Sequence, residues 1–132
     1  MEFCEIRITR EPLNAAGLNF SHTEGAVVDF FGVVRTIEND RIIDGIEYEA
    51  FEEMAERQLV LIAEEVRHRS RLALVIIHHR IGYVRAGEAS LFVRVAAKHR
   101  RAAFEGSSEI IERLKQSVPI WKHPVYANAQ IA

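Results

Sequence analysis

The chain has 132 residues, of which 48% are apolar and 27% charged, a balance typical of one soluble globular domain spanning residues 1–132. A formal net charge of −2 argues against a general nucleic-acid-binding protein, and no stretch approaches the ~18 apolar residues needed to cross a bilayer. The one cysteine, Cys4, excludes an internal disulfide and fits a reducing compartment, so we expect a cytoplasmic protein that does not bind membranes.

The N-terminal part of the chain is expected to contain two strands. Apolar and polar residues alternate over residues 3–9, as they do in a half-buried strand. Pro12 suits the first turn of a short helix that ends near Gly17. Residues 25–34 are almost continuously apolar and predict a central strand, in which Gly32 indicates a bulge or the close approach of another backbone.

Three further strands and a helix are expected in the middle of the chain. The polar residues 35–44 predict a mobile connection to a strand over residues 45–51. Apolar residues spaced by four, three and four predict an amphipathic helix over residues 53–69, which should pack on a sheet. Strands are expected over residues 74–80 and 89–97, and two glycines in their connection would let them close an antiparallel pair.

The same spacing of apolar residues predicts a second helix after the last of these strands. This helix should end near Gln116, because Pro119 disfavours helical geometry at Val118. Lys115 then lies in the last turn, and Lys122 lies beyond the helix. Strands and helices do not alternate strictly along the chain, so we predict an α+β fold with a largely antiparallel sheet and flanking helices.

Charge is distributed unevenly along the chain. Residues 38–65 contain ten carboxylates and two arginines, whereas residues 94–122 contain seven lysines and arginines and three glutamates. The acidic part is typical of a solvated helix face, and it could also contact a basic partner. The basic part indicates a site for a small anion, which the average charge of the chain conceals.

Lys115 and Lys122 are the candidate active groups of this basic part. A lysine can act as an acid, a base, an amine nucleophile or a fixed positive charge. Lys115 also has a simpler interpretation, because a cation in the last helical turn interacts favourably with the helix dipole. Lys122 follows an apolar, non-helical stretch from Pro119 to Trp121 that would anchor it. The residues alone leave both interpretations open.

Other polar residues of the chain suggest binding. His99 and Arg100 follow a strand and open a helix, where free backbone N–H groups and both side chains could bind phosphate. Arg35, at the exit of the apolar strand, could do the same, although each of these residues could equally be a solvated surface group. The adjacent His78 and His79 point to opposite faces of a strand and cannot easily share a metal, so we expect no metal site and no cofactor.

Five segments, taken in order, resemble the large, catalytic subunit of molybdopterin synthase. They are Gly25–Arg35, Tyr48–Ala55, His79–Gly82, His99–Phe104 and Leu114–Lys122. The resemblance covers nearly the whole chain. It implies an α/β hammerhead fold and a homodimer of large subunits, each of which binds a small ubiquitin-like partner to make a heterotetramer.

The resemblance also implies a function, which is sulfur transfer in molybdenum cofactor biosynthesis. The C-terminal Gly-Gly thiocarboxylate of the small partner would enter a pocket and deliver sulfur to cyclic pyranopterin monophosphate, and two transfers would make the dithiolene of molybdopterin. The two active-site lysines of the family match Lys115 and Lys122, each of which could supply charge, a proton or an amine. The substrate-binding positions that match are Val33, Val34, Arg35, His99, Arg100 and His123.

The chain departs from the family pattern after Lys122. The family usually continues with a basic residue and a glutamate, and often with a longer tail that contains glycine and tryptophan, whereas His123 and Pro124 follow here. This departure keeps open a second interpretation, a non-catalytic binding or regulatory protein that retains the anion pocket. A third, an RNA-binding module in the basic half, is disfavoured by the net charge and by the lack of an exposed aromatic stacking set.

Overall fold

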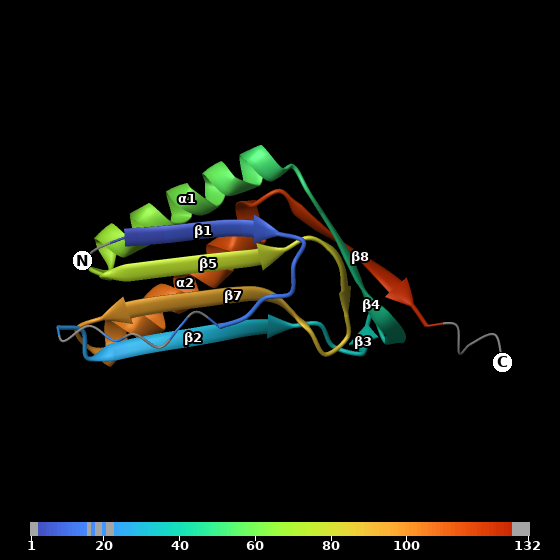
Figure 1. The fold of residues 1–132 in the computed structure, drawn as a ribbon, viewed down its shortest axis with the longest axis horizontal. Helices are drawn as coiled ribbons and strands as arrows, with labels where there is room; N and C mark the ends of the chain where they lie inside the picture. Colours follow the sequence, from blue (N-terminus) through green and yellow to red (C-terminus); the bar gives the residue numbers. More distant parts are fainter. Residues whose placement is uncertain (1–2, 16, 18–19, 21–22, 128–132) are drawn as a thin grey trace.

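The computed structural model describes residues 3–15, 17, 20 and 23–127. Two helices and a larger sheet make up one end of the molecule, and a smaller sheet makes up the other (Figure 1). Strands and helices do not alternate along the chain, and antiparallel strand pairs outnumber the one parallel pair among the described residues. The predicted α+β class is therefore confirmed.

The larger sheet has four strands in the order β1-β5-β7-β2. These strands are β1 (Phe3–Thr9), β5 (Leu74–Arg80), β7 (Ala89–Ala97) and β2 (Ala26–Val33). β1 runs parallel to β5, and the other neighbours are antiparallel. β5 and β7 lie in the middle of the sheet and are buried along nearly their whole length, as their apolar sequences predict. The pairing of β2 with β7 shifts between Gly32 and Val33, which is the bulge predicted from Gly32.

Both helices cover the same face of this sheet (Figure 1). α1 spans Glu52–Arg69 and α2 spans Arg100–Ser117, and the residues that they bury follow the predicted spacing. Leu59 of α1 and Ile110 of α2 belong to one continuous core with the inward side chains of β5 and β7, and neither is exposed. Burial of this apolar face is what holds the helices on the sheet.

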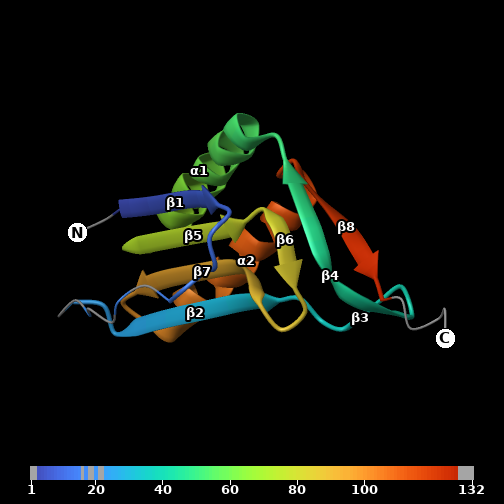
Figure 2. The same cartoon turned by 45° about the vertical axis from the view of Figure 1, so that its right-hand side comes forward.

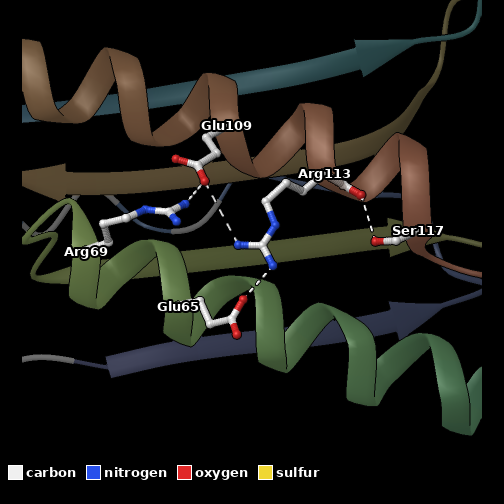
Figure 3. Close-up of polar contacts among 5 residues, drawn as sticks. All are labelled: Glu65, Arg69, Glu109, Arg113 and Ser117. Atoms are coloured by element: carbon white, nitrogen blue, oxygen red, sulfur yellow. Dashed lines mark hydrogen bonds and ion pairs between the residues drawn. The ribbon is translucent and has the colours of Figure 1, made fainter.

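Charged side chains connect the two helices at the surface (Figure 3). Arg113 of α2 lies 2.5 Å from Glu65 of α1 and 4.0 Å from Glu109, which is one turn earlier on its own helix. Glu109 also pairs with Arg69 at the end of α1, and Ser117 donates a hydrogen bond of 3.0 Å to the carbonyl oxygen of Arg113. This network links α1 and α2 at the surface, outside the core that the two helices share.

The smaller sheet forms around one long strand (Figure 2). Its members are β3 (Ile37–Glu38), β4 (Arg41–Ala50), β6 (Gly82–Arg85) and β8 (Ile120–Tyr126). β4 lies between β6 and β8, and β3 pairs with its first two residues. Ile46 and Tyr48 of β4 face inward and pack with Val84 in a second, smaller core, while Glu47 and Glu49 face outward.

The predicted short helix between Pro12 and Gly17 is wrong for the residues that the structure describes, and position 16 lies outside them. These described residues have no regular secondary structure. Instead, the carbonyl oxygen of Gly17 accepts a hydrogen bond of 2.7 Å from Arg94, a buried residue on the face of the sheet that the helices leave open. Arg94 also binds both carboxylate oxygens of Asp29, and these hydrogen bonds raise the pKa of its guanidinium. Gly17 therefore lies against the face of the sheet that the helices leave open.

Three strands of the smaller sheet, β3, β6 and β8, are not predicted from the sequence. The connection over residues 35–44 contains β3 and the start of β4, which begins four residues before the predicted strand. Similarly, β6 lies within the connection between β5 and β7, and β8 follows α2 without having been predicted. Each of these strands is short or exposed on one side, so its apolar pattern is weak. No helix in the described part of the chain combines the length and apolarity needed to cross a membrane.

Candidate functional site

A pocket of about 470 Å³ opens where the two sheets and the end of α2 meet. Its lining residues come from both sheets and from α2: Phe30, Gly32, Val33, Arg35, Tyr48, His79, Ser90, Leu91, Leu114, Lys115, Val118, Ile120 and Lys122. The apolar members come mainly from β2, β7 and the end of α2. Three cations, Arg35, Lys115 and Lys122, join them. The structure therefore brings together four of the residues that the sequence proposed for the site, Val33 and the three cations.

The ends of α2 and of the following turn determine where the two lysines lie. α2 ends at Ser117, and the extended backbone of Val118, with ψ at 131°, leads through Pro119 into β8. Lys115 is thus in the last helical turn, as predicted. Lys122 is directly opposite Tyr48 in the antiparallel pair of β8 and β4, so both side chains point to the same side of the sheet. That side is the pocket.

One carboxylate links two of the three cations. Glu38 on β3 lies 3.7 Å from Nη2 of Arg35 and 3.4 Å from Nζ of Lys122. The Glu38 side chain is only 21% exposed, whereas Arg35 and Lys122 are 81% and 54% exposed. Glu38 therefore acts as an internal counter-ion at the edge of the pocket. Sequence reasoning assigned it only to the acidic part of the chain.

A tight turn holds Glu38 in this position. Asn39 and Asp40, which follow it, have φ values of 54° and 60°, the conformation that closes a two-residue hairpin between β3 and β4. The side-chain amide of Asn39 donates a hydrogen bond of 3.0 Å to the hydroxyl of Tyr126, and the guanidinium of Arg41 stacks 3.9 Å from the centre of the same ring. The turn is therefore attached to β8, the strand that carries Lys122.

His79 contributes a neutral imidazole to the pocket. It lies near the end of β5 and is only 5% exposed. Its burial lowers the pKa of the imidazole below the ordinary value of 6.5, and a hydrogen bond to the carbonyl oxygen of Arg80 opposes this effect in part. The Nδ1 atom of His79 lies 2.8 Å from that oxygen, and the ring of Tyr48 packs edge-on against the imidazole at 5.4 Å. His79 is therefore uncharged at neutral pH.

His99 and Arg100 lie at the other end of α2. With a rise of 1.5 Å per residue, the fifteen steps from Arg100 to Lys115 span about 22 Å. His99 and Arg100 line a separate, shallow depression together with Arg101, Phe104 and Glu105. Within one chain, the structure therefore does not bring this basic pair into the pocket that contains the lysines.

Two other predicted binding residues lie outside the pocket lining. Val34 is buried in the smaller core, and its backbone binds the connection between β6 and β7 through Glu88 and Gly87. His123 follows Lys122 on β8 and therefore points to the opposite side of the sheet. There its Nε2 atom lies 3.0 Å from a carboxylate oxygen of Glu49.

The composition of the pocket limits its chemistry. Three cations above an apolar floor suit a ligand that combines a phosphate or carboxylate with a less polar body. Within the described part of the chain, no three His, Cys, Asp or Glu side chains are grouped so that they could hold a metal ion. Cys4 lies on the far edge strand, and burial raises the pKa of its thiol to about 11, with the nearby Glu64 adding to the effect. This thiol is therefore not an activated nucleophile.

The fold and the pocket together define an α+β protein with a pocket lined by three cations. The model of the MoaE protein family matches residues 8–117. The molybdopterin synthase catalytic subunit of Bacillus subtilis is 36% identical over 126 residues, which cover 93% of this chain and 80% of that protein. The chain therefore belongs to the MoaE family, and the resemblance noted from its sequence is confirmed.

Solved structures agree with this assignment. Molybdopterin synthase from Staphylococcus aureus superimposes with a TM-score of 0.83 at 32% identity, covering 94% of this chain and 91% of that one. A complex of subunits 1 and 2 of molybdopterin-converting factor from Helicobacter pylori gives a TM-score of 0.64 at 22% identity, covering 95% of this chain and 90% of the matched chain. The second likeness concerns the fold alone.

Proposed function

We propose that this chain is the catalytic subunit of a molybdopterin synthase and that its pocket is where sulfur is transferred. In this reaction a partner protein with a C-terminal Gly-Gly thiocarboxylate gives its sulfur to cyclic pyranopterin monophosphate. Two such transfers make the dithiolene of molybdopterin, and the protein is a cytoplasmic sulfurtransferase. The observation that carries the proposal is the convergence of Arg35, Lys115 and Lys122 on one pocket in a member of the MoaE family.

The three cations have different surroundings, which suggests different roles. Arg35 is largely exposed at the edge and presents a guanidinium fork suited to the substrate phosphate. Lys115 emerges beside the apolar floor and is not paired with a carboxylate among the described residues, so it is free to contact the reacting atoms. Lys122 is held by Glu38 and stabilises negative charge that develops as the sulfur attacks.

A small partner subunit would deliver the sulfur. The Helicobacter pylori structure is a complex of two subunits, which supports a partner of this kind. Some residues of the pocket lining, such as Val33, are exposed, so the pocket is open to solvent. An extended C-terminal tail could therefore reach Lys115 from outside. We propose one such partner for each catalytic subunit.

A second copy of this chain would complete the site. His99 and Arg100 match substrate-binding positions of the family, yet they lie about 22 Å from Lys115 along α2. A homodimer in which α2 of one copy approaches the pocket of the other would resolve this separation. The whole assembly would then be a heterotetramer of two catalytic and two small subunits.

The direct test is reconstitution. The purified chain is mixed with a thiocarboxylated Gly-Gly partner and cyclic pyranopterin monophosphate, and molybdopterin is detected by fluorescence of its oxidised derivative. The proposal predicts product that depends on all three components. Binding of the partner and the substrate without any product would instead support the alternative of a non-catalytic paralogue, which the departures at His123 and Pro124 motivate.

A mixed dimer tests whether the site is shared. Lys115→Ala and Arg100→Ala chains carrying different tags are co-expressed, and the heterodimer is purified through both tags. In a shared site, one of the two pockets contains an intact Lys115 and an intact Arg100 from different chains, so activity should recover to about half of the wild-type value. If each chain uses its own Arg100, both pockets are defective and the heterodimer stays inactive.

A further inference from the structure

The roles proposed for the three cations leave the buried histidine of the pocket without a role. His79 is buried at the base of the pocket with its Nδ1 atom next to the carbonyl oxygen of Arg80. A carbonyl oxygen only accepts hydrogen bonds, so Nδ1 must carry the proton and donate it. In the neutral ring that the lowered pKa favours, the other nitrogen, Nε2, then carries a lone pair and no proton.

This lone pair is accessible from the pocket. Nε2 of His79 makes no hydrogen bond with any residue that the structure describes. Among the described residues, Nε of Arg80 is the one side-chain nitrogen or oxygen that is both inaccessible to solvent and without a hydrogen-bond partner. Because Nε2 of His79 has no partner either and is not such an atom, it retains some access to solvent. The open space that His79 lines is the pocket.

The other polar groups of the pocket cannot easily accept a proton. The charged and titratable groups that share the space with His79 are Arg35, Tyr48, Lys115 and Lys122, with Glu38 at the edge. The cations have only donors, the neutral hydroxyls of Tyr48 and Ser90 are very weak bases, and Glu38 is engaged by two cations. His79 is therefore the neutral nitrogen acceptor of the pocket.

We propose that His79 is a proton acceptor in the reaction at this site. Its Nε2 atom takes the proton of an O–H or N–H group on the bound phosphate-bearing substrate. The bond from oxygen or nitrogen to hydrogen breaks, its electron pair stays on the substrate, and an Nε2–H bond forms. The imidazolium then returns the proton to the substrate or to solvent before the next turnover. Negative charge on the substrate phosphate offsets the positive ring during this step.

The neighbouring histidine supplies a matched control. His78 is equally buried, at 6% exposure, but it points to the opposite face of the sheet, where its Nε2 atom lies 2.6 Å from Glu5. It lines a different depression, which contains Arg7 and Pro12. A substitution at position 78 therefore perturbs the same strand to a similar extent without touching the pocket that contains Lys115.

This inference rests on the proposed function, and the experiment separates the two. In the reconstituted reaction, His79→Gln keeps a polar atom in the pocket but cannot accept a proton at neutral pH. We expect its kcat to fall about 100-fold, as is usual when a general base is removed, with KM changed less than threefold. The kcat/KM of the wild type should decline as the pH falls through the pKa of His79, which lies below 6.5. This decline should be absent in His79→Gln. His78→Gln should keep the wild-type kcat and pH profile.

Three outcomes would decide against these ideas. A His79→Gln enzyme with kcat within threefold of the wild type would overturn the role of His79, while absence of product with the wild type would overturn the proposed function instead. Nitrogen-15 NMR of the wild-type imidazole gives a test that does not depend on any variant folding. A protonated Nε2 at pH 7 would overturn the inference, and an unprotonated Nε2 that titrates below pH 6.5 would support it.

Discussion

The larger sheet, with its two helices, and the smaller sheet of this protein differ in how much of each is buried. The larger sheet buries one face under α1 and α2, and side chains such as Leu59 and Val93 are completely enclosed there. The smaller sheet has a minor core and carries Lys122 and Glu38 at an exposed edge. The pocket lies where the two meet: the larger sheet and α2 supply its apolar floor together with His79 and Lys115, and the smaller sheet supplies Lys122. We expect substitutions in the core and in the pocket to affect different properties.

The largest effect should come from the pocket and should leave stability intact. Lys115→Ala is expected to lower kcat by about 1000-fold, which corresponds to about 4 kcal/mol of transition-state stabilisation. Its free energy of unfolding should change by less than about 1 kcal/mol, because a cation at a helix end contributes little. Rates from the reconstituted reaction and urea unfolding measure the two quantities. Lys115→Arg separates positive charge from amine chemistry, and Arg57→Ala, an exposed cation on α1, serves as the control.

The converse effect is expected in the core under α1. Leu59→Ala should lower the free energy of unfolding by about 3 kcal/mol, because it leaves a cavity in a fully enclosed site. The fraction that remains folded should retain its kcat. Leu61→Ala is a matched control on the same helix, since Leu61 is 48% exposed, and it should cost less than about 0.5 kcal/mol. Equal losses from the two variants would contradict the assignment of stability to this core.

His79, a pocket residue, should make the free energy of unfolding depend on pH. Its pKa is lowered by burial, so between the unfolded value of about 6.5 and the lower folded value the unfolded chain binds more protons than the native protein. Stability from this group is therefore complete above pH 6.5 and falls as the pH drops through that window. Denaturant titrations from pH 8 to pH 5 should show a steeper loss for the wild type than for His79→Gln. Parallel curves would show that the histidine does not titrate in this way.

The smallest effect should come from the charged network between the helices (Figure 3). Arg113→Ala removes the contacts with Glu65 and Glu109, and we expect a loss of about 0.5 kcal/mol because these side chains are partly exposed. The loss should shrink in 1 M salt, where surface charges are screened. A double-mutant cycle with Glu65→Ala measures the coupling directly. A loss comparable to that of Leu59→Ala would mean that the interhelical contacts matter as much as the core.

The larger sheet could be predicted from the sequence, and much of the smaller sheet could not. Strands β1, β5 and β7 and both helices have regular apolar patterns, because one face or both faces are buried. β8 has no such pattern, since Trp121, Lys122 and His123 are all exposed and Pro124 interrupts the run. β8 forms a strand because β4 supplies its hydrogen-bond partners, and β4 lies about 70 residues earlier in the chain, beyond the reach of a local sequence pattern. β3 is only two residues long and leaves no periodic signal.

The presence or absence of a local sequence pattern also explains which candidate site residues could be predicted. Lys115 was predicted from the end of a helix and Lys122 from the apolar segment before it, and the family resemblance supported both. Arg35 was predicted from the end of a strand. Glu38 could not be distinguished from nine other carboxylates in the acidic part of the chain, because only the fold shows its two cationic partners. His79 did leave a usable signal. It alternates with Val75 and Ile77, which face the helices, so β5 itself indicates which of the two histidines lies on the inner side.

The pairing of β8 with β4 makes the pocket sensitive to the length of the segment before it. Tyr48 is opposite Lys122, and the next residue, His123, faces the other way. Side chains of a strand alternate with a period of two, so sliding β8 by one position would exchange every inward group for an outward one. The pocket would then contain an imidazole or an indole in place of the amine. We therefore expect activity to depend on the number of residues between the end of α2 and Lys122, because a single insertion or deletion there would change which side chains face the pocket.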